Sequence, residues 1–141
     1  MAGQLINFSC VAESDGSLCY VEGSKDIPFD VKRLFYIFDV PKNEIRANHA
    51  NTKTEFVLIA ISGVIDVELI DEVGSTEYTL DKKTQGLYVP KMTWMKTSNF
   101  SADAILLVIA SALYEEGGYV EDYKLFLNLL KQNKSFNGKG D

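Results

Sequence analysis

Short runs of apolar and β-branched residues recur along the chain, and turn-forming residues follow each run. In one run, Ile65, Val67 and Leu69 alternate with Asp66 and Glu68, which is the period of a strand with one buried face. The runs that predict strands lie at residues 5–12, 18–21, 32–40, 54–61, 64–70, 76–80, 87–90 and 104–111. Many short strands at this spacing are typical of sandwiches and barrels, so we expect an all-β double-sheet jelly roll.

One segment, at residues 119–131, has the period of a helix instead. Its apolar residues recur at i, i+4, i+7, i+8 and i+11, namely at Tyr119, Tyr123, Phe126, Leu127 and Leu130. This spacing forms one apolar stripe, so we expect a C-terminal helix that packs across one face or end of the β body. Its tyrosines are expected to belong to the core rather than to contact a ligand.

The length and composition are those of one globular domain. A chain of 141 residues can bury a large core without disulfides or metals. We therefore expect a single domain over residues 1–133, followed by a flexible tail at 134–141. The chain has 14 Lys and Arg against 20 Asp and Glu, a net charge of −6. This balance argues against nucleic acid or an anionic membrane as partner, because either would need a basic surface.

The N-terminus and the cysteines predict a cytoplasmic protein. The first residues have neither the basic region nor the apolar core of a signal peptide. The longest apolar run, at 104–110, is far shorter than the roughly 20 residues of a membrane helix. Two cysteines, Cys10 and Cys19, make no disulfide framework, and we expect them to be small hydrophobic strand residues in a reducing compartment.

The single histidine, His49, limits the chemistry available to this chain. At a two-residue period, its strand face continues through Asn51, Lys53, Glu55, Val57, Ile59 and Ile61. This face could run from a cavity mouth into the core, or its polar part could be a solvated row, and both interpretations remain open. His49 and Glu55 supply two metal ligands, which cannot close a stable site, so we predict no metal.

Several motifs occur in a fixed order along the chain. They are Ile27-Pro28-Phe29-Asp30-Val31-Lys32-Arg33, Tyr36-Ile37-Phe38-Asp39-Val40-Pro41, Arg46-x-x-His49-Ala50, Gly86-Leu87-Tyr88-Val89-Pro90 with Trp94, and the segment from Ala110-Ser111 to Tyr123. The spacing His49-x-Asn51-x-x-x-Glu55 before Ser62-Gly63 resembles the first cupin motif. In this order, the motifs resemble the dTDP-4-keto-6-deoxyglucose 3,4-ketoisomerases of the cupin superfamily over about residues 4–127.

The chain departs from the family pattern at one important position. Where the family has Arg-Gly-x-His-Ala-His, this chain has Arg46-Ala47-Asn48-His49-Ala50-Asn51. Asparagine keeps a hydrogen-bonding side chain of similar reach, but it cannot exchange protons near neutral pH. Natural variation and a deliberate His-to-Asn substitution would both produce this sequence. Activity weaker than that of a two-histidine relative is therefore expected.

The resemblance implies a cupin-type jelly roll with one C-terminal helix and a homodimeric isomerase of deoxyamino-sugar biosynthesis, for lipopolysaccharide or S-layer sugars. The reaction moves a ketone from carbon 4 to carbon 3 of a dTDP-linked sugar through an enediol, without a cofactor. Such a tautomerisation needs a group that titrates near pH 7. His49 is the predicted proton shuttle, and Asn51 is expected to assist as a donor or an orienting group.

The implied diphosphate needs cationic partners in an acidic protein. Arg33 and Arg46 are the candidates, because a guanidinium matches phosphate oxygens in a bidentate geometry, although surface ion pairs are the alternative. Trp94 is predicted to bind substrate by stacking on thymine, with a place in the core equally open. A sugar-nucleotide 3,5-epimerase and a non-catalytic nucleotide-sugar-binding cupin remain alternative functions.

Overall fold

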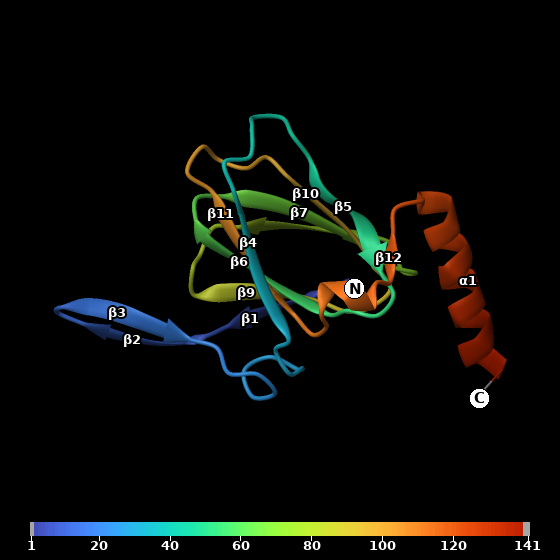
Figure 1. Cartoon of the computed structure of the whole chain (residues 1–141), viewed down its shortest axis with the longest axis horizontal. Coiled ribbons are helices and arrows are strands. Elements are labelled where there is room, and N and C mark those ends of the chain that lie inside the picture. The colour runs from blue at the N-terminus through green and yellow to red at the C-terminus, as the bar shows by residue number, and fades with distance from the viewer. Residues whose placement is uncertain (1, 140–141) are drawn as a thin grey trace.

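The computed structural model describes the backbone of residues 2–139 and the side chains of residues 2–133. Within these residues the chain forms β-strands, one short 3-10 helix and one C-terminal α-helix (Figure 1). The elements are β1 (Gln4–Asn7), β2 (Ser9–Glu13), β3 (Gly16–Tyr20), β4 (Arg33–Phe38), β5 (Arg46–Asn51), β6 (Phe56–Ser62), β7 (Ile65–Ile70), β8 (Ser75–Leu80), β9 (Gln85–Val89), β10 (Thr93–Ser98), β11 (Ile105–Ala110), η1 (Tyr114–Glu116), β12 (Tyr119–Val120) and α1 (Tyr123–Lys139).

Two five-stranded antiparallel sheets form the body of the molecule (Figure 1). One sheet has the strand order β1-β9-β6-β11-β4, and the other has the order β12-β5-β10-β7-β8. The main core lies between the sheets and includes the fully buried residues Ile65, Leu69, Leu87 and Leu106. The expected all-β double-sheet jelly roll with one C-terminal helix is confirmed.

The sheet assignment of β5 and β6 corrects one expectation from the sequence. Leu58 of β6 faces the main core, whereas Val57 and Ile59 pack in a separate cluster on the outer face of their sheet. The prediction that Val57 and Ile59 share the face of His49 is therefore wrong. The chain leaves β5, turns through residues 52–55 and enters β6 in the opposite sheet, so the alternation does not continue across the turn.

The C-terminal helix begins later than the periodicity predicts. Tyr119 and Val120 form the edge strand β12, which pairs with the end of β5, and α1 begins at Tyr123. Asp122 precedes α1, and its Oδ1 accepts a hydrogen bond from the backbone N–H of Leu125 at 3.1 Å, as an N-cap residue does. The predicted helix over 119–131 is thus a strand, a cap and a helix in succession.

The end of α1 overlaps the tail that was predicted to be flexible. The backbone is helical to Lys139, and residues 140–141 lie outside the described residues. None of the described helices is long and apolar enough to cross a membrane.

Helix α1 covers the outer face of the second sheet at the end where β12, β5 and β10 lie. Its anchor is Phe126, whose side chain is completely buried. The cluster beneath the helix consists of Ala50, Trp94, Val120, Phe126 and Leu130. The prediction that the helix packs on one face of the β body is therefore confirmed.

The hairpin of β2 and β3 projects away from the two sheets (Figure 1). Cys10 and Cys19 face each other across its strands, and both are free and exposed. The two cysteines lie on strands as expected, but they are not packed as core residues, because every hairpin side chain in the described chain is exposed.

Candidate active site

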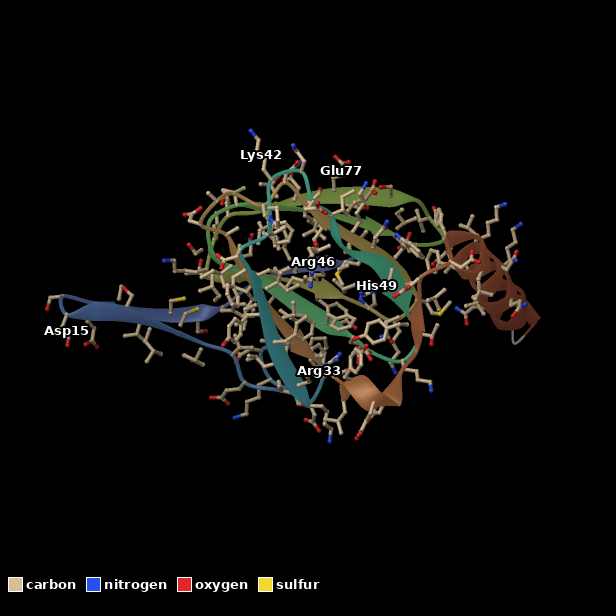
Figure 2. The ribbon with its side chains drawn as sticks, turned by 45° about the horizontal axis from the view of Figure 1, so that its top comes forward. Asp15, Arg33, Lys42, Arg46, His49 and Glu77 are labelled. Atoms are coloured by element: carbon tan, nitrogen blue, oxygen red, sulfur yellow. The ribbon has the colours of Figure 1, made fainter. Side chains whose placement is uncertain are left out.

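A cavity of about 620 Å³ lies between the two sheets, beneath β4 and β5. Its lining is apolar at depth and polar near the mouth, as in many small-molecule sites. The lining residues are Arg33, Phe35, Ile37, Ile45, Arg46, Ala47, His49, Phe56, Leu58, Met95, Leu106, Val108, Tyr114, Tyr119 and Glu121. The cavity therefore brings together three of the five residues that the sequence proposed for the site. Figure 2 shows these three, Arg33, Arg46 and His49, on β4 and β5 around the space between the sheets.

A bulge in β5 places Arg46 and His49 on the same cavity. Residues three apart in a regular strand point to opposite faces. Here Met95 of β10 pairs with His49 while Thr97 pairs with Arg46, so β5 holds one extra residue between these pairs. Ala47 within this segment has a φ of 53°, and the Thr97 hydroxyl donates to the carbonyl of Arg46 at 2.8 Å. The bulge turns the Arg46 side chain to the same face as His49, and the alternation pattern could not have predicted it.

The His49 side chain is held in a half-buried position at the cavity wall. Its ring packs edge-on against Tyr119, with ring centroids 5.0 Å apart. Its Nδ1 is buried and has no hydrogen-bond partner among the described residues. Burial lowers the pKa of His49 below its usual 6.5, and the Glu121 carboxylate partly opposes this shift. The imidazole is therefore mainly neutral near pH 7 and is able to accept a proton.

The Arg33 guanidinium lies at the same mouth, among aromatic rings. Its Nη2 donates to the Tyr119 hydroxyl at 2.9 Å, and its central carbon lies 5.2 Å from the ring centre of Phe35 and 5.5 Å from that of Tyr114. Its Nε is buried without a hydrogen-bond partner among the described residues. Across the described side chains, neither Arg33 nor Arg46 forms an ion pair with a carboxylate. Both charges therefore remain available to an anionic ligand.

The Asn51 side chain binds to the backbone and does not line the large cavity. Its Oδ1 accepts hydrogen bonds from the backbone N–H groups of Lys53, at 2.8 Å, and Thr54, at 2.7 Å. The side chain is buried beside a narrow void that it shares with His49, and its Nδ2 has no partner in the described structure. Asn51 thus closes the turn that carries the chain from β5 to β6.

Trp94 lies outside the cavity, contrary to the stacking role predicted for it. The indole is buried beneath α1, where its ring centroid is 5.5 Å from that of Phe126 and 5.1 Å from that of Tyr123. Its Nε1 donates to Asn48 Oδ1 at 2.9 Å. On β10, Trp94 and Met95 point to opposite faces, and Met95 lines the cavity. Trp94 therefore takes the core position that the sequence had left open.

Three polar cavity residues were absent from the sequence-based site: Tyr114, Tyr119 and Glu121. The spacing of Tyr119 from Tyr123 and Phe126 had placed it in the apolar stripe of a predicted helix. The sequence carried a local signal for a different structure, because two glycines, Gly117 and Gly118, come directly before Tyr119. In the structure they adopt positive φ values of 70° and 91°. Two adjacent glycines followed by a capping aspartate mark a chain that turns before a helix begins.

The described residues contain no group of three or more His, Cys, Asp and Glu side chains that could hold a metal ion. Glu55, which the cupin motif pairs with His49, accepts a hydrogen bond from the Tyr88 hydroxyl at 2.5 Å. The polar groups at the cavity mouth are instead two guanidiniums, an imidazole, a carboxylate and phenols. This set suits the binding of an anion and the movement of protons.

The fold and the cavity define the class as a cupin-type jelly roll with a cavity between its sheets that is lined by polar and apolar side chains. Residues 1–131 match the protein family described as FdtA: WxcM-like, C-terminal, and the chain belongs to that family. The chain is 40% identical over 126 residues to the TDP-4-oxo-6-deoxy-alpha-D-glucose-3,4-oxoisomerase of Aneurinibacillus thermoaerophilus, covering 89% of this chain and 91% of that protein.

Solved structures of sugar ketoisomerases share the architecture. QdtA, a sugar 3,4-ketoisomerase from Thermoanaerobacterium thermosaccharolyticum solved with TDP, matches with a TM-score of 0.89 and 32% identity, over 94% of this chain and 96% of that chain. A histidine-to-asparagine mutant of that enzyme was solved with TDP-4-keto-6-deoxyglucose. WlaRA, a TDP-fucose-3,4-ketoisomerase from Campylobacter jejuni, matches with a TM-score of 0.87 and 36% identity, over 92% and 96% of the chains.

Epimerase structures at 12–13% identity share only the fold. The predicted family and isomerase class are confirmed by the closer relatives.

Proposed function

We propose that this chain converts a TDP-4-keto-6-deoxyhexose into its 3-keto isomer and that His49 moves the proton at carbon 3. The observation that carries the proposal is the cavity in which a neutral, half-buried imidazole lies with two unpaired guanidiniums. The same fold in relatives named as 3,4-ketoisomerases supports it. The ketone moves without net oxidation, so the proposed reaction uses no cofactor.

In the proposed reaction, His49 removes the proton at carbon 3 while an acid protonates the oxygen at carbon 4. The protonated His49 then gives its proton to carbon 4 of the enediol, while the carbon 3 hydroxyl loses its proton to the group that acted as the acid and becomes the new carbonyl. A neutral imidazole can perform the first step because its lowered pKa leaves it unprotonated near pH 7. The apolar walls formed by residues such as Leu58 and Val108 exclude water and strengthen the electrostatic interactions at the mouth.

Arg33 and Arg46 are the proposed partners of the diphosphate. Both line the cavity, and neither is neutralised by a carboxylate among the described side chains. Charge-assisted hydrogen bonds from guanidinium to phosphate are about twice as strong as neutral ones. Because each arginine can bind two phosphate oxygens in plane, we expect Arg46→Lys to weaken TDP binding even though the charge is kept.

The decisive experiment follows TDP-4-keto-6-deoxyglucose by NMR in deuterated water. Exchange at carbon 3 together with a new 3-keto product is the expected result. Exchange at carbon 5 would support the 3,5-epimerase instead, and tight binding without exchange would support a non-catalytic binding protein. Either of these outcomes would contradict the proposed function.

Two variants test the assigned roles in the same assay. His49→Asn keeps a polar side chain but removes the titrating group, so we expect turnover to fall by about 10²- to 10⁴-fold with TDP binding retained. Asn51→His adds a group that exchanges protons beside His49, and the rate is expected to rise. No increase would show that position 51 takes no part in the chemistry.

We also propose that a second copy of this chain covers two exposed apolar surfaces. Val11, Leu18 and Tyr20 lie on one face of the projecting hairpin, and all three are exposed. An isolated two-stranded hairpin is only marginally stable in water, so it needs a surface to pack against. The other surface lies on β4, an edge strand whose outward side chains Leu34, Tyr36 and Phe38 are 54%, 61% and 56% exposed.

A two-fold dimer would cover the hairpin and β4 in both copies at once. We expect sedimentation to give twice the chain mass, and Leu18→Asp to give a monomer. Val73→Asp is the matched control, because Val73 is equally apolar but lies at the remote turn between β7 and β8. A wild-type monomer at micromolar concentration would contradict the dimer.

A further inference from the structure

The proposed tautomerisation needs a second proton-transfer group, and the position expected from the sequence does not supply one. Asn51 cannot exchange protons near neutral pH. Its Oδ1 already accepts two backbone hydrogen bonds, and its side chain lies beside the small void rather than on the large cavity. The group that protonates the oxygen at carbon 4 must therefore come from another element of the fold.

Tyr119 occupies the position such a group needs. The short strand β12 pairs with β5, so Tyr119 lies opposite Asn51 and next to His49. The Tyr119 and His49 rings meet edge to face with their centroids 5.0 Å apart, and both line the same cavity. A sugar ring whose carbon 3 reaches His49 would therefore place its carbon 4 oxygen within the same small region of the wall.

The hydroxyl of Tyr119 is also oriented by Arg33, which leaves its own hydrogen available to a ligand. The oxygen accepts a hydrogen bond from Arg33 Nη2 at 2.9 Å, and its own proton has no acceptor among the described residues. A phenol is protonated near neutral pH and can both donate and accept. The Arg33 guanidinium would stabilise negative charge on the oxygen as the proton leaves, because charge-assisted hydrogen bonds strengthen when the acceptor becomes anionic. The other ionisable groups on the cavity are His49, Arg33, Arg46, Tyr114 and Glu121, and Tyr114 is an exposed residue of η1.

We propose that Tyr119 is the catalytic acid that protonates the oxygen at carbon 4, an inference that rests on the proposed ketoisomerase function. His49 takes the carbon 3 proton, the C–H electrons form the C3–C4 double bond, and the carbonyl π electrons take the Tyr119 proton. The phenolate then removes the proton of the carbon 3 hydroxyl, a carbonyl forms there, and the imidazolium protonates carbon 4. Both residues return to their starting states, so no oxidant or reductant is consumed.

Tyr119→Phe tests this inference, with Tyr123→Phe as the matched control, because Tyr123 is the first residue of α1 and lies outside the cavity. We expect Tyr119→Phe to lower kcat by about 10²- to 10⁴-fold and to slow carbon 3 exchange, with TDP affinity retained. The Tyr123→Phe control should keep wild-type turnover, because this ring packs against Trp94 outside the cavity. A higher KM with an unchanged kcat would mean that Tyr119 only positions Arg33, and this result would overturn the inference.

A second variant, Tyr119→His, tests the same role and also serves if the Tyr119→Phe protein does not fold. Tyr119→His supplies an acid that loses its proton in roughly the pH 6–7 range. The kcat of this variant should therefore fall as the pH rises through that range, which the wild-type kcat should not do. A kcat profile without that limb would overturn the role of Tyr119. A wild-type enzyme that produces no 3-keto sugar would instead refute the proposed function itself, so the two failures are distinguishable.

Discussion

Replacing Asn51 with alanine should destabilise the protein substantially, although this residue does not line the large cavity. The substitution removes the acceptor of two backbone N–H groups, those of Lys53 and Thr54. The bond from Thr54 is buried, so no water molecule could replace Asn51 as the acceptor for the Thr54 N–H group. An unsatisfied buried donor costs about 1–3 kcal/mol, and an accessible lost hydrogen bond costs about 0.5–1.5 kcal/mol. We therefore expect a loss of roughly 2–4 kcal/mol in the free energy of unfolding.

The expected change in melting temperature follows from the size of the chain. An unfolding entropy of about 2.1 cal/mol/K per residue makes 1 kcal/mol equivalent to about 3 °C for a protein of 141 residues. Asn51→Ala should thus lower Tm by roughly 6–12 °C, as measured by calorimetry with urea unfolding as a second method.

The matched control is Asn128→Ala, at an exposed position in α1 that makes no side-chain hydrogen bond among the described residues. Surface substitutions of this kind usually change stability by less than about 0.5 kcal/mol. An Asn51→Ala protein that melts at the same temperature as the Asn128→Ala protein would refute the structural role assigned to Asn51.

Three further substitutions test other parts of the site. Ala47→Gly relieves a left-handed backbone conformation that costs about 1–2 kcal/mol, and it removes a methyl group whose burial is worth at most about 0.8 kcal/mol. The free energy of unfolding should therefore rise by up to about 1 kcal/mol, and a lower Tm would contradict this. Trp94→Phe removes the hydrogen bond to Asn48 and should lower the free energy of unfolding by about 1–3 kcal/mol. Calorimetric titration should give an unchanged TDP affinity, and weaker TDP binding would mean that Trp94 contacts the ligand. Glu121→Gln removes the carboxylate that raises the pKa of His49, so the acid limb of kcat/KM should move to lower pH, and a shift to higher pH would be inconsistent with this interaction.

Much of the fold could be predicted because its signals are local. Alternation in Ile65, Val67 and Leu69 identified β7, and the apolar stripe around Phe126 identified α1. The strands that were missed, β5, β10 and β12, contain polar or very short segments. The polar residues of β5 look like a solvated row in the sequence, but Arg46 and His49 line an interior cavity. Local pattern cannot distinguish a wet outer face from a polar cavity wall.

The site was predicted in part for the same reason. His49 was identified because it is the one histidine, and Arg33 and Arg46 because the chain has so few arginines. Tyr119 was missed because its spacing from Tyr123 fits a helix, and its pairing with β5 is a contact between distant parts of the chain. Trp94 was left open between the site and the core because the face of β10 that meets α1 becomes known only when the helix is docked.

The amino-acid sequence by itself determined the class of fold, the C-terminal helix, the family and the residue that can exchange protons near pH 7. These properties follow from residue type and short-range period, which act within a few positions of the chain. The tertiary structure alone decided which side chains share the cavity. The hydrogen bond between Arg33 and Tyr119 joins residues 86 positions apart, and the β5 bulge turns Arg46 toward His49. Sheet pairing and a one-residue shift in register create both arrangements, and neither leaves a period in the sequence.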